Sequence, residues 1–190
     1  MRLSFQESSI DDLILCLSQL YAFNDDIYQQ LFQLTLQKRL MAWPMLGDDA
    51  ASGNFKLRSL MILRTLMRSD AITASLATSK PSLVLIFELF ERIGREQAHL
   101  PECEQLVNIS RIVLRLAQNP HTLPTFAESN QCGNTNVETL LFLLTTKNYH
   151  VLQSSLRALL ELAQSDDTVG VLSRHLQEHS LHHLLEIIQE

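Results

Sequence analysis

The chain contains few of the residues that interrupt helices. Only five glycines and five prolines occur among 190 residues, whereas 37 residues are leucine. Leucine favours helices, while glycine and proline disfavour helix interiors. Alternating Val, Ile and Thr runs joined by Asn-Gly or Asp-Gly turns, which mark strands and hairpins, do not occur. The sequence therefore predicts an all-α protein, and its 46% hydrophobic content is enough for one domain with a continuous core.

Other absences exclude whole classes of protein. No dense Lys/Arg run occurs in a chain of formal net charge −6, so nucleic acid is not expected as the main ligand. The longest apolar stretch, SLVLIFELF at 82–90, is far shorter than the ~20 residues that span a bilayer. The start of the chain, which soon becomes acidic, does not resemble a signal peptide. The three cysteines (Cys16, Cys103 and Cys132) are odd in number and far apart, which predicts an intracellular protein of the cytoplasm or nucleus.

Sequence motifs of catalysis are absent too. Glycine-rich phosphate loops, GxSxG and CxxC do not occur. Adjacent acids such as Asp166 and Asp167 do not face each other on a helix, and most such pairs stand at helix starts, where they complement the helix dipole. Cys103 stands between two glutamates, which raise the pKa of a thiol, the opposite of what a nucleophile needs. We therefore expect no enzymatic activity and no cofactor.

Histidines cluster near the end of the sequence. His175, His179 and His183 would share one face of an unbroken helix, a spacing that can hold zinc. Ser180, however, is a good N-cap for a new helix from Leu181, and a break there separates the imidazoles. No metal site is expected.

Capping residues, prolines and glycines delimit the predicted helices. Pro81 opens a helix that Gly94 is expected to close in the left-handed conformation. Pro101 precedes a helix that ends at Gln118, and residues 129–136 (SNQCGNTN) form the most polar loop. Two helices are predicted within residues 9–42, and the others at 57–67, 137–146, 149–164, 168–178 and 181–189. Connections are short, and no linker separates two domains.

Three stretches of the chain align with one another without gaps: LMILRTLMRSD at 60–70, SRIVLRLAQNP at 110–120 and LRALLELAQSD at 156–166. They start 50 and 46 residues apart, and a short helix is predicted after each. Their leucines coincide, and so do the polar residues that end each stretch. Three later apolar residues (Leu76, Phe126 and Leu172) coincide as well. A helical unit that recurs every 40–50 residues is the signature of an α-solenoid. The alternative is an ordinary leucine-rich bundle that aligns with itself by chance.

Residues 138–165 carry the best-formed unit. An apolar helix with four leucines is followed by Asn148, Val151 and Gln153 and then by ALLELA at 158–163 (the four are Leu140, Leu141, Leu143 and Leu144). This pattern resembles an armadillo repeat, and residues 82–128 match it partly. The resemblance implies a right-handed α-solenoid of armadillo/HEAT-like repeats. Residues 1–190 would then form a single domain, with divergent helices at 1–54 and about three units at 55–190, the last one incomplete.

Armadillo proteins that bind extended peptides carry an asparagine on the third helix of successive repeats. The matching positions here are Thr65, Arg115 and Glu161, so this mode of binding is not expected. Arginine pairs spaced four residues apart lie on one face of their helices instead. The predicted partner-binding residues are Arg64, Arg68, Arg111, Arg115, Arg157 and Glu161. The alternative is that these arginines are ordinary solvated side chains, paired with acids and worth little.

These observations predict a non-catalytic scaffold or adaptor. Its partner would be an acidic or amphipathic protein segment, either a helix or a disordered stretch, held in the concave groove of the solenoid. The alternative is a structural subunit that is permanently assembled into a larger complex through exposed end helices. Leu184, Ile187 and Ile188, within a repeat whose third helix is missing, would be uncovered in a fragment or isoform of a longer solenoid.

Large aromatic residues are expected mainly in the core. These are Trp43, Phe87, Phe90 and Tyr149. Any of them that lies exposed is a leading candidate for a binding hot spot.

Overall fold

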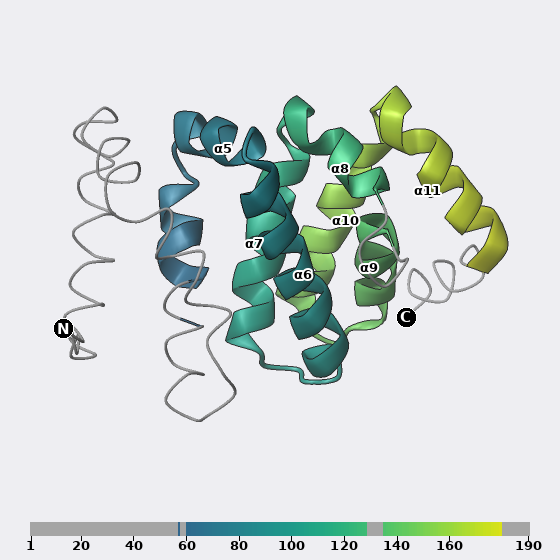
Figure 1. Cartoon of the computed structure of the whole chain (residues 1–190). Helices are drawn as coiled ribbons and strands as arrows, with labels where there is room; N and C mark the ends of the chain where they lie inside the picture. Colours follow the sequence, from purple (N-terminus) through teal and green to yellow (C-terminus); the bar gives the residue numbers. More distant parts are fainter. Residues whose placement is uncertain (1–56, 58–59, 129–134, 180–190) are drawn as a thin grey trace. The chain divides into compact units, whose positions relative to one another are not determined.

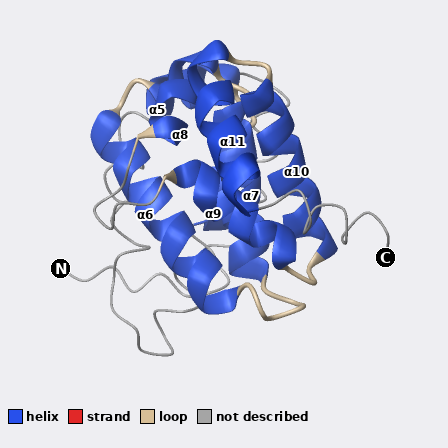
Figure 2. Ribbon diagram, turned by 90° about the vertical axis from the view of Figure 1, so that its right-hand side faces the viewer, coloured by secondary structure: helices blue, strands red, loops and turns tan. Residues whose placement is uncertain are grey.

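The computed structural model describes Leu57 and residues 60–128 and 135–179 (Figure 1). Of these residues, 82% are helical and none lies in a β-strand, which confirms the all-α prediction. Figure 2 shows only helices and connecting loops in this part of the chain. The predicted helices within residues 9–42 and at 181–189 lie outside the described residues.

The chain divides into two compact units, residues 1–76 and 77–190. Each unit is described by itself, and the single continuous domain expected from the sequence stays a prediction. In the first unit residues 60–66 are helical, and α5 (Asp70–Ala77) begins after a short turn. Thr73 Oγ1 lies 3.0 Å from the carbonyl oxygens of both Met67 and Ser69, and its hydroxyl donates to these groups at the turn.

The second unit consists of helices joined by short connections. Its elements are α6 (Lys80–Gln97), α7 (Glu104–Ala117), η3 (Pro120–Thr122), α8 (Leu123–Ala127), α9 (Asn136–Phe142), η4 (Leu143–Thr145), α10 (Tyr149–Ala163) and α11 (Asp166–His179). The predicted helix between Pro101 and Gln118 is confirmed as α7, and those at 149–164 and 168–178 as α10 and α11. The one predicted at 137–146 is α9 extended by η4.

These elements form two successive groups of three: α6–α7–α8 and α9–α10–α11. Each element contacts its counterpart, because α6 packs on α9, α8 on α11 and, most extensively, α7 on α10 (Figure 1). Within the first group α7 also packs against α6. The two groups are therefore joined mainly by equivalent helices, with a further contact between α8 and α9.

Apolar side chains at helical spacing form the core of the second unit. The rings of Phe87 on α6 and Phe126 on α8 meet edge to face, with centroids 4.9 Å apart. Phe90, Phe126 and Leu116 are fully buried. Phe87 and Phe90 thus lie in the core as predicted, whereas Tyr149 is exposed and its core assignment was wrong. Tyr149 directly follows the N-cap of α10, so its side chain leaves the helix before the buried face begins.

A threonine closes the same junction in both groups. The Thr122 hydroxyl donates to the carbonyl oxygens of Leu116 and Asn119, six and three residues earlier. The Thr168 hydroxyl donates to those of Leu162 and Ser165 at the same spacing. The last carbonyls of a helix have no partner within it, so each threonine satisfies the end of α7 or α10. The two threonines also coincide in the sequence alignment.

Asn148 links the loops that precede α7 and α10. Its Oδ1 caps α10 by accepting from the backbone N–H groups of His150 (3.1 Å) and Val151 (3.3 Å), while its Nδ2 donates to the Pro101 carbonyl at 2.9 Å. Beside it, the Thr146 hydroxyl donates to the Ala98 carbonyl at 3.0 Å. The asparagine of the armadillo-like pattern therefore both starts a helix and fixes one group against the other.

Gly94 does not close α6, contrary to the sequence prediction. The helix continues to Gln97, and the Gly94 carbonyl accepts from the N–H of Ala98 at 3.1 Å. A Cβ atom on Gly94 would lie 3.6 Å from side-chain atoms of Leu143 and Thr139. Gly94 therefore packs against α9 and η4. A left-handed conformation is not needed at Gly94, because the helix does not end there.

We expect Asn148→Ala to lower the free energy of unfolding by about 1–3 kcal/mol, since it removes an N-cap and leaves the Pro101 carbonyl unpaired. Asn148→Asp keeps the cap and loses only the donor, so it should cost less. Urea unfolding followed by circular dichroism measures both. Asn119→Ala, which removes the cap of the exposed η3 turn, is the matched control. Equal effects of the alanine variants at 148 and 119 would contradict the linking role of Asn148.

Gly94→Ala should raise the free energy of unfolding by up to about 1 kcal/mol, because alanine favours a helix interior over glycine. The added Cβ makes only ordinary van der Waals contacts with Leu143 and Thr139. Thermal unfolding compares it with Gly170→Ala on α11, where a Cβ meets nothing within 4 Å. Destabilisation by Gly94→Ala alone would show that α6 and α9 approach more closely than described.

Candidate interaction surface

The described residues show no metal cluster and no complete membrane span. No group of three or more His, Cys, Asp or Glu side chains lies within reach of one ion there. The predicted zinc alternative involves side chains at 175–183, which lie outside this description. No single described helix is both long and apolar enough to cross a membrane, although α5 and α6 meet that criterion as a pair across a break.

Cys103 is the N-cap residue of α7. Its Sγ accepts from the Leu106 backbone N–H at 3.4 Å, and its S–H donates to Gln97 Oε1 at 2.6 Å. Burial is the largest cause that raises the pKa of this thiol, and the charge of Glu104 adds to it, while backbone hydrogen bonds oppose them. The prediction from the sequence attributed the raised pKa of this thiol to the neighbouring acids, but their charge is the smaller cause. The Cys103 thiol therefore stays protonated and caps the start of α7.

Four predicted partner-binding residues occupy equivalent positions on adjacent helices. Arg111 and Arg115 are partly exposed on α7, four residues apart. Arg157 is exposed on α10, and Glu161, one turn later, is partly exposed. Among the described residues no ion pair joins Arg157 to Glu161, so this i,i+4 pair does not neutralise itself. Because α7 packs along α10, the structure brings these four residues onto two neighbouring helices.

The remaining two predicted residues lie in the first unit. Arg64 is partly exposed within the helix at 60–66, and Arg68 is exposed in the turn that follows it. The two units are described separately, so the structure does not join Arg64 and Arg68 to the other four. The six-residue surface as a whole stays a prediction.

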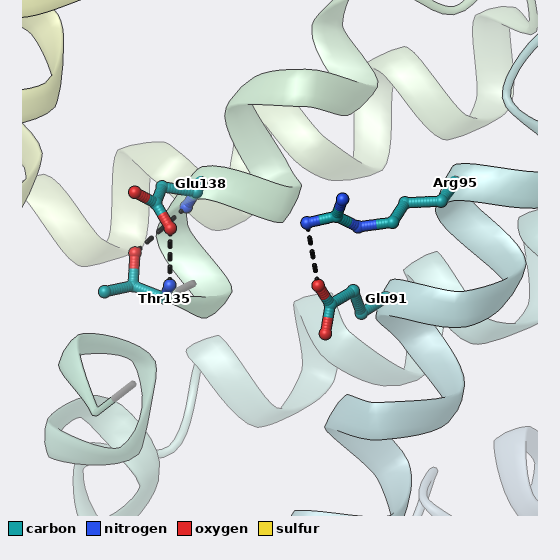
Figure 3. A network of polar contacts seen from close by, with 4 residues as sticks. All are labelled: Glu91, Arg95, Thr135 and Glu138. Carbon is teal, nitrogen blue, oxygen red and sulfur yellow. Dashed lines mark hydrogen bonds and ion pairs between the residues drawn. The ribbon is translucent and has the colours of Figure 1, made fainter. Parts of the chain in front are cut away.

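A pocket of about 310 Å³ lies between α6 and α9, lined by Arg95, Glu138, Thr139 and Phe142. Its charged groups contact their own helices (Figure 3). Arg95 pairs with Glu91 one turn earlier at 2.8 Å, and Glu138 Oε2 accepts from the Thr135 backbone N–H at 2.6 Å in a capping box. Sequence reasoning missed the pocket, because its walls come from helices about 40 residues apart in the chain. Only the Thr135–Glu138 capping box was readable in advance.

The exposed side of α10 carries a continuous row of apolar residues, here called the α10 stripe. Tyr149, Leu156 and Leu160 are 67%, 43% and 61% exposed, and Leu152 and Ala163 lie between or beyond them on the same side. Their spacing of three or four residues places them along one helix face. The sequence held a signal for this stripe, since the leucines of α10 extend around more of the helix than one buried face can cover.

Most of the equivalent side of α7 is buried. Leu106, Ser110 and Ala117 align with Leu152, Leu156 and Ala163, and all three are buried. Leu114, which aligns with Leu160, is partly exposed. The difference arises because α7 lies between α6 and α10, while no described helix takes the corresponding place beside α10. The α10 stripe is thus an apolar face that no described helix covers as α10 covers α7.

Comparison with known proteins adds no relative: no protein-family model, curated protein or solved structure matches the chain.

Two neighbouring leucines on α10 test the exposure of the stripe. Leu159 is 8% exposed and Leu160 is 61% exposed. Leu159→Ala should lower the free energy of unfolding by about 2–5 kcal/mol, and Leu160→Ala by no more than about 0.5 kcal/mol. Chemical denaturation at a low protein concentration measures both. A large loss in Leu160→Ala would show that another part of the chain covers the stripe.

Proposed function

We propose that the chain is a right-handed α-solenoid of armadillo/HEAT-like repeats that acts as a non-catalytic, intracellular scaffold. The observation that carries this proposal is the contact between equivalent helices of the groups α6–α7–α8 and α9–α10–α11. The equivalent hydrogen bonds of the Thr122 and Thr168 hydroxyls support the proposal. In an ordinary bundle the same helix-to-helix connection is not expected to occur twice. In a solenoid each unit packs mainly on its neighbours.

The partner would be an acidic or amphipathic protein segment that lies across α7 and α10. Arg111, Arg115 and Arg157 offer guanidinium groups, which bind carboxylates through two parallel hydrogen bonds. Glu161 beside them would accept from a basic or amide group and so fix the register of the segment. Arg64 and Arg68 belong to the first unit, and their part in partner binding stays a prediction.

The α10 stripe favours a second candidate function, that of a structural subunit assembled into a larger complex. Exposed apolar rows mark interaction sites more often than they remain in solvent. A permanent interface would cover Tyr149, Leu156 and Leu160, whereas a transient partner on the arginines would leave them exposed. The two candidates therefore predict different sensitive residues.

Affinity capture from cell lysate with the variant Arg111→Glu/Arg115→Glu tests the scaffold proposal. Both side chains are surface groups outside the α10 stripe, so circular dichroism should show an unchanged fold. We expect a captured partner to fall at least tenfold against the wild type. The attraction should also weaken as salt rises, because salt screens charges beyond about 10 Å at 0.1 M.

The control is Arg92→Glu/Arg174→Glu, which makes the same change in net charge at exposed positions of α6 and α11. It should retain the partner. An identical partner list for the wild type and both variants would remove the arginines of α7 from the binding surface.

A further inference from the structure

Exposed large apolar side chains are not evenly spread over the described part of the chain. Seven are exposed there, and three of them, Tyr149, Leu156 and Leu160, lie on one side of α10. Tyr149 and Leu160 are the two most exposed of all. Single exposed leucines are common on soluble proteins, but a row along one helix is typical of an interface.

The structure itself shows what kind of surface covers such a row. On α7 most positions equivalent to the stripe are buried, although Leu114, the equivalent of Leu160, is partly exposed. The helix that packs most extensively on α7 is α10. A helix that packs on the α10 stripe would contact α10 as α10 contacts α7. Its occupant is therefore a helix with an apolar face.

The spacing of the stripe fits a second copy of the same helix. Leu152 and Leu160 lie four residues before and after Leu156, and Tyr149 and Ala163 lie seven residues before and after it. An antiparallel copy centred on Leu156 would place leucine against leucine, and the large Tyr149 against the small Ala163. A two-fold interface requires such self-complementarity. We propose that two copies of this chain associate through antiparallel α10 helices.

Arg157 at the edge of the proposed interface makes the affinity of the dimer depend on salt. Arg157 is exposed and adjoins Leu156, so the two-fold axis brings the Arg157 side chains of both copies near each other. Like charges repel, and added salt screens them. This dimer is therefore strengthened by salt, whereas an acidic partner helix on the same stripe would be weakened. A helix of 15 residues is about 22 Å long, so the contact is smaller than a standard interface, and the dimer dissociates on dilution.

Sedimentation velocity of the full chain over a wide concentration range tests the proposal. The wild type should pass from monomer to dimer as concentration rises, and Leu160→Glu and Leu156→Glu should stay monomeric. Leu160→Ala is the milder variant, which should weaken association at least tenfold with an unchanged fold. Val84→Glu, at an exposed position of α6 outside the stripe, should dimerise like the wild type.

A size exchange tests the antiparallel register. Tyr149→Ala leaves two small residues facing each other, and Ala163→Tyr places two large ones together, so each should weaken the dimer. The double variant restores a large residue opposite a small one and should recover dimerisation. Arg157→Gln should dimerise more tightly than the wild type.

A wild type that is monomeric at every concentration would overturn the proposal, as would a dimer that Leu160→Glu leaves intact. A dimer that salt or Arg157→Gln weakens, or that the double variant does not recover, would overturn the antiparallel arrangement. None of these results depends on Arg111 or Arg115, so the dimer and the proposed scaffold function are tested by separate experiments.

Discussion

The packing of α7 against α10 is the contact on which the described architecture of the second unit depends. It is the most extensive contact between helices there, and it joins two groups that also meet through α6–α9, α8–α11 and α8–α9. The loops that start both helices are fixed together by Asn148 and Thr146, which bond to the Pro101 and Ala98 carbonyls. The ends of both helices are closed by Thr122 and Thr168. The starts of the two helices are thus joined to each other, and their ends are closed in the same way.

Beside this contact, α7 and α10 each present two kinds of surface. One side carries Arg111 and Arg115 on α7 and Arg157 and Glu161 on α10, and remains accessible to solvent. The other side carries the α10 stripe on α10 and the equivalent positions on α7, most of which are buried. The proposed partner binding uses the first side and the proposed dimer the second, and Arg157 lies at the edge of both.

Much of the fold could be predicted from local features of the sequence. Proline, capping residues and leucine spacing located α7, α10 and α11, because helix ends depend on nearby side chains. Gly94 was misread, since α6 continues past it and packs against Leu143, a contact that no local pattern reveals. Tyr149 was placed in the core on its size alone, although it stands at the first turn of α10 on the uncovered side.

The candidate surfaces were harder to predict for the same reason. The arginine positions followed from the alignment of α7 with α10, which the structure shows to be neighbours. The pocket between α6 and α9 requires side chains from two distant segments. The α10 stripe depends on which faces of a helix are covered, and the hydrophobic pattern of α10 alone does not distinguish a face that packs within the chain from one that packs beyond it.

Hydrogen exchange of the full chain, read by mass spectrometry, tests the central role of the α7–α10 contact most directly. Amides in the best-packed elements exchange only through the largest openings. We predict that the amides of α7 and α10 are the slowest of the second unit and exchange at matching rates, slower than those of α8, α9 and α11. Fast exchange in α10 beside slow exchange in α7 would contradict the account, because the two helices would then not form one cooperative core.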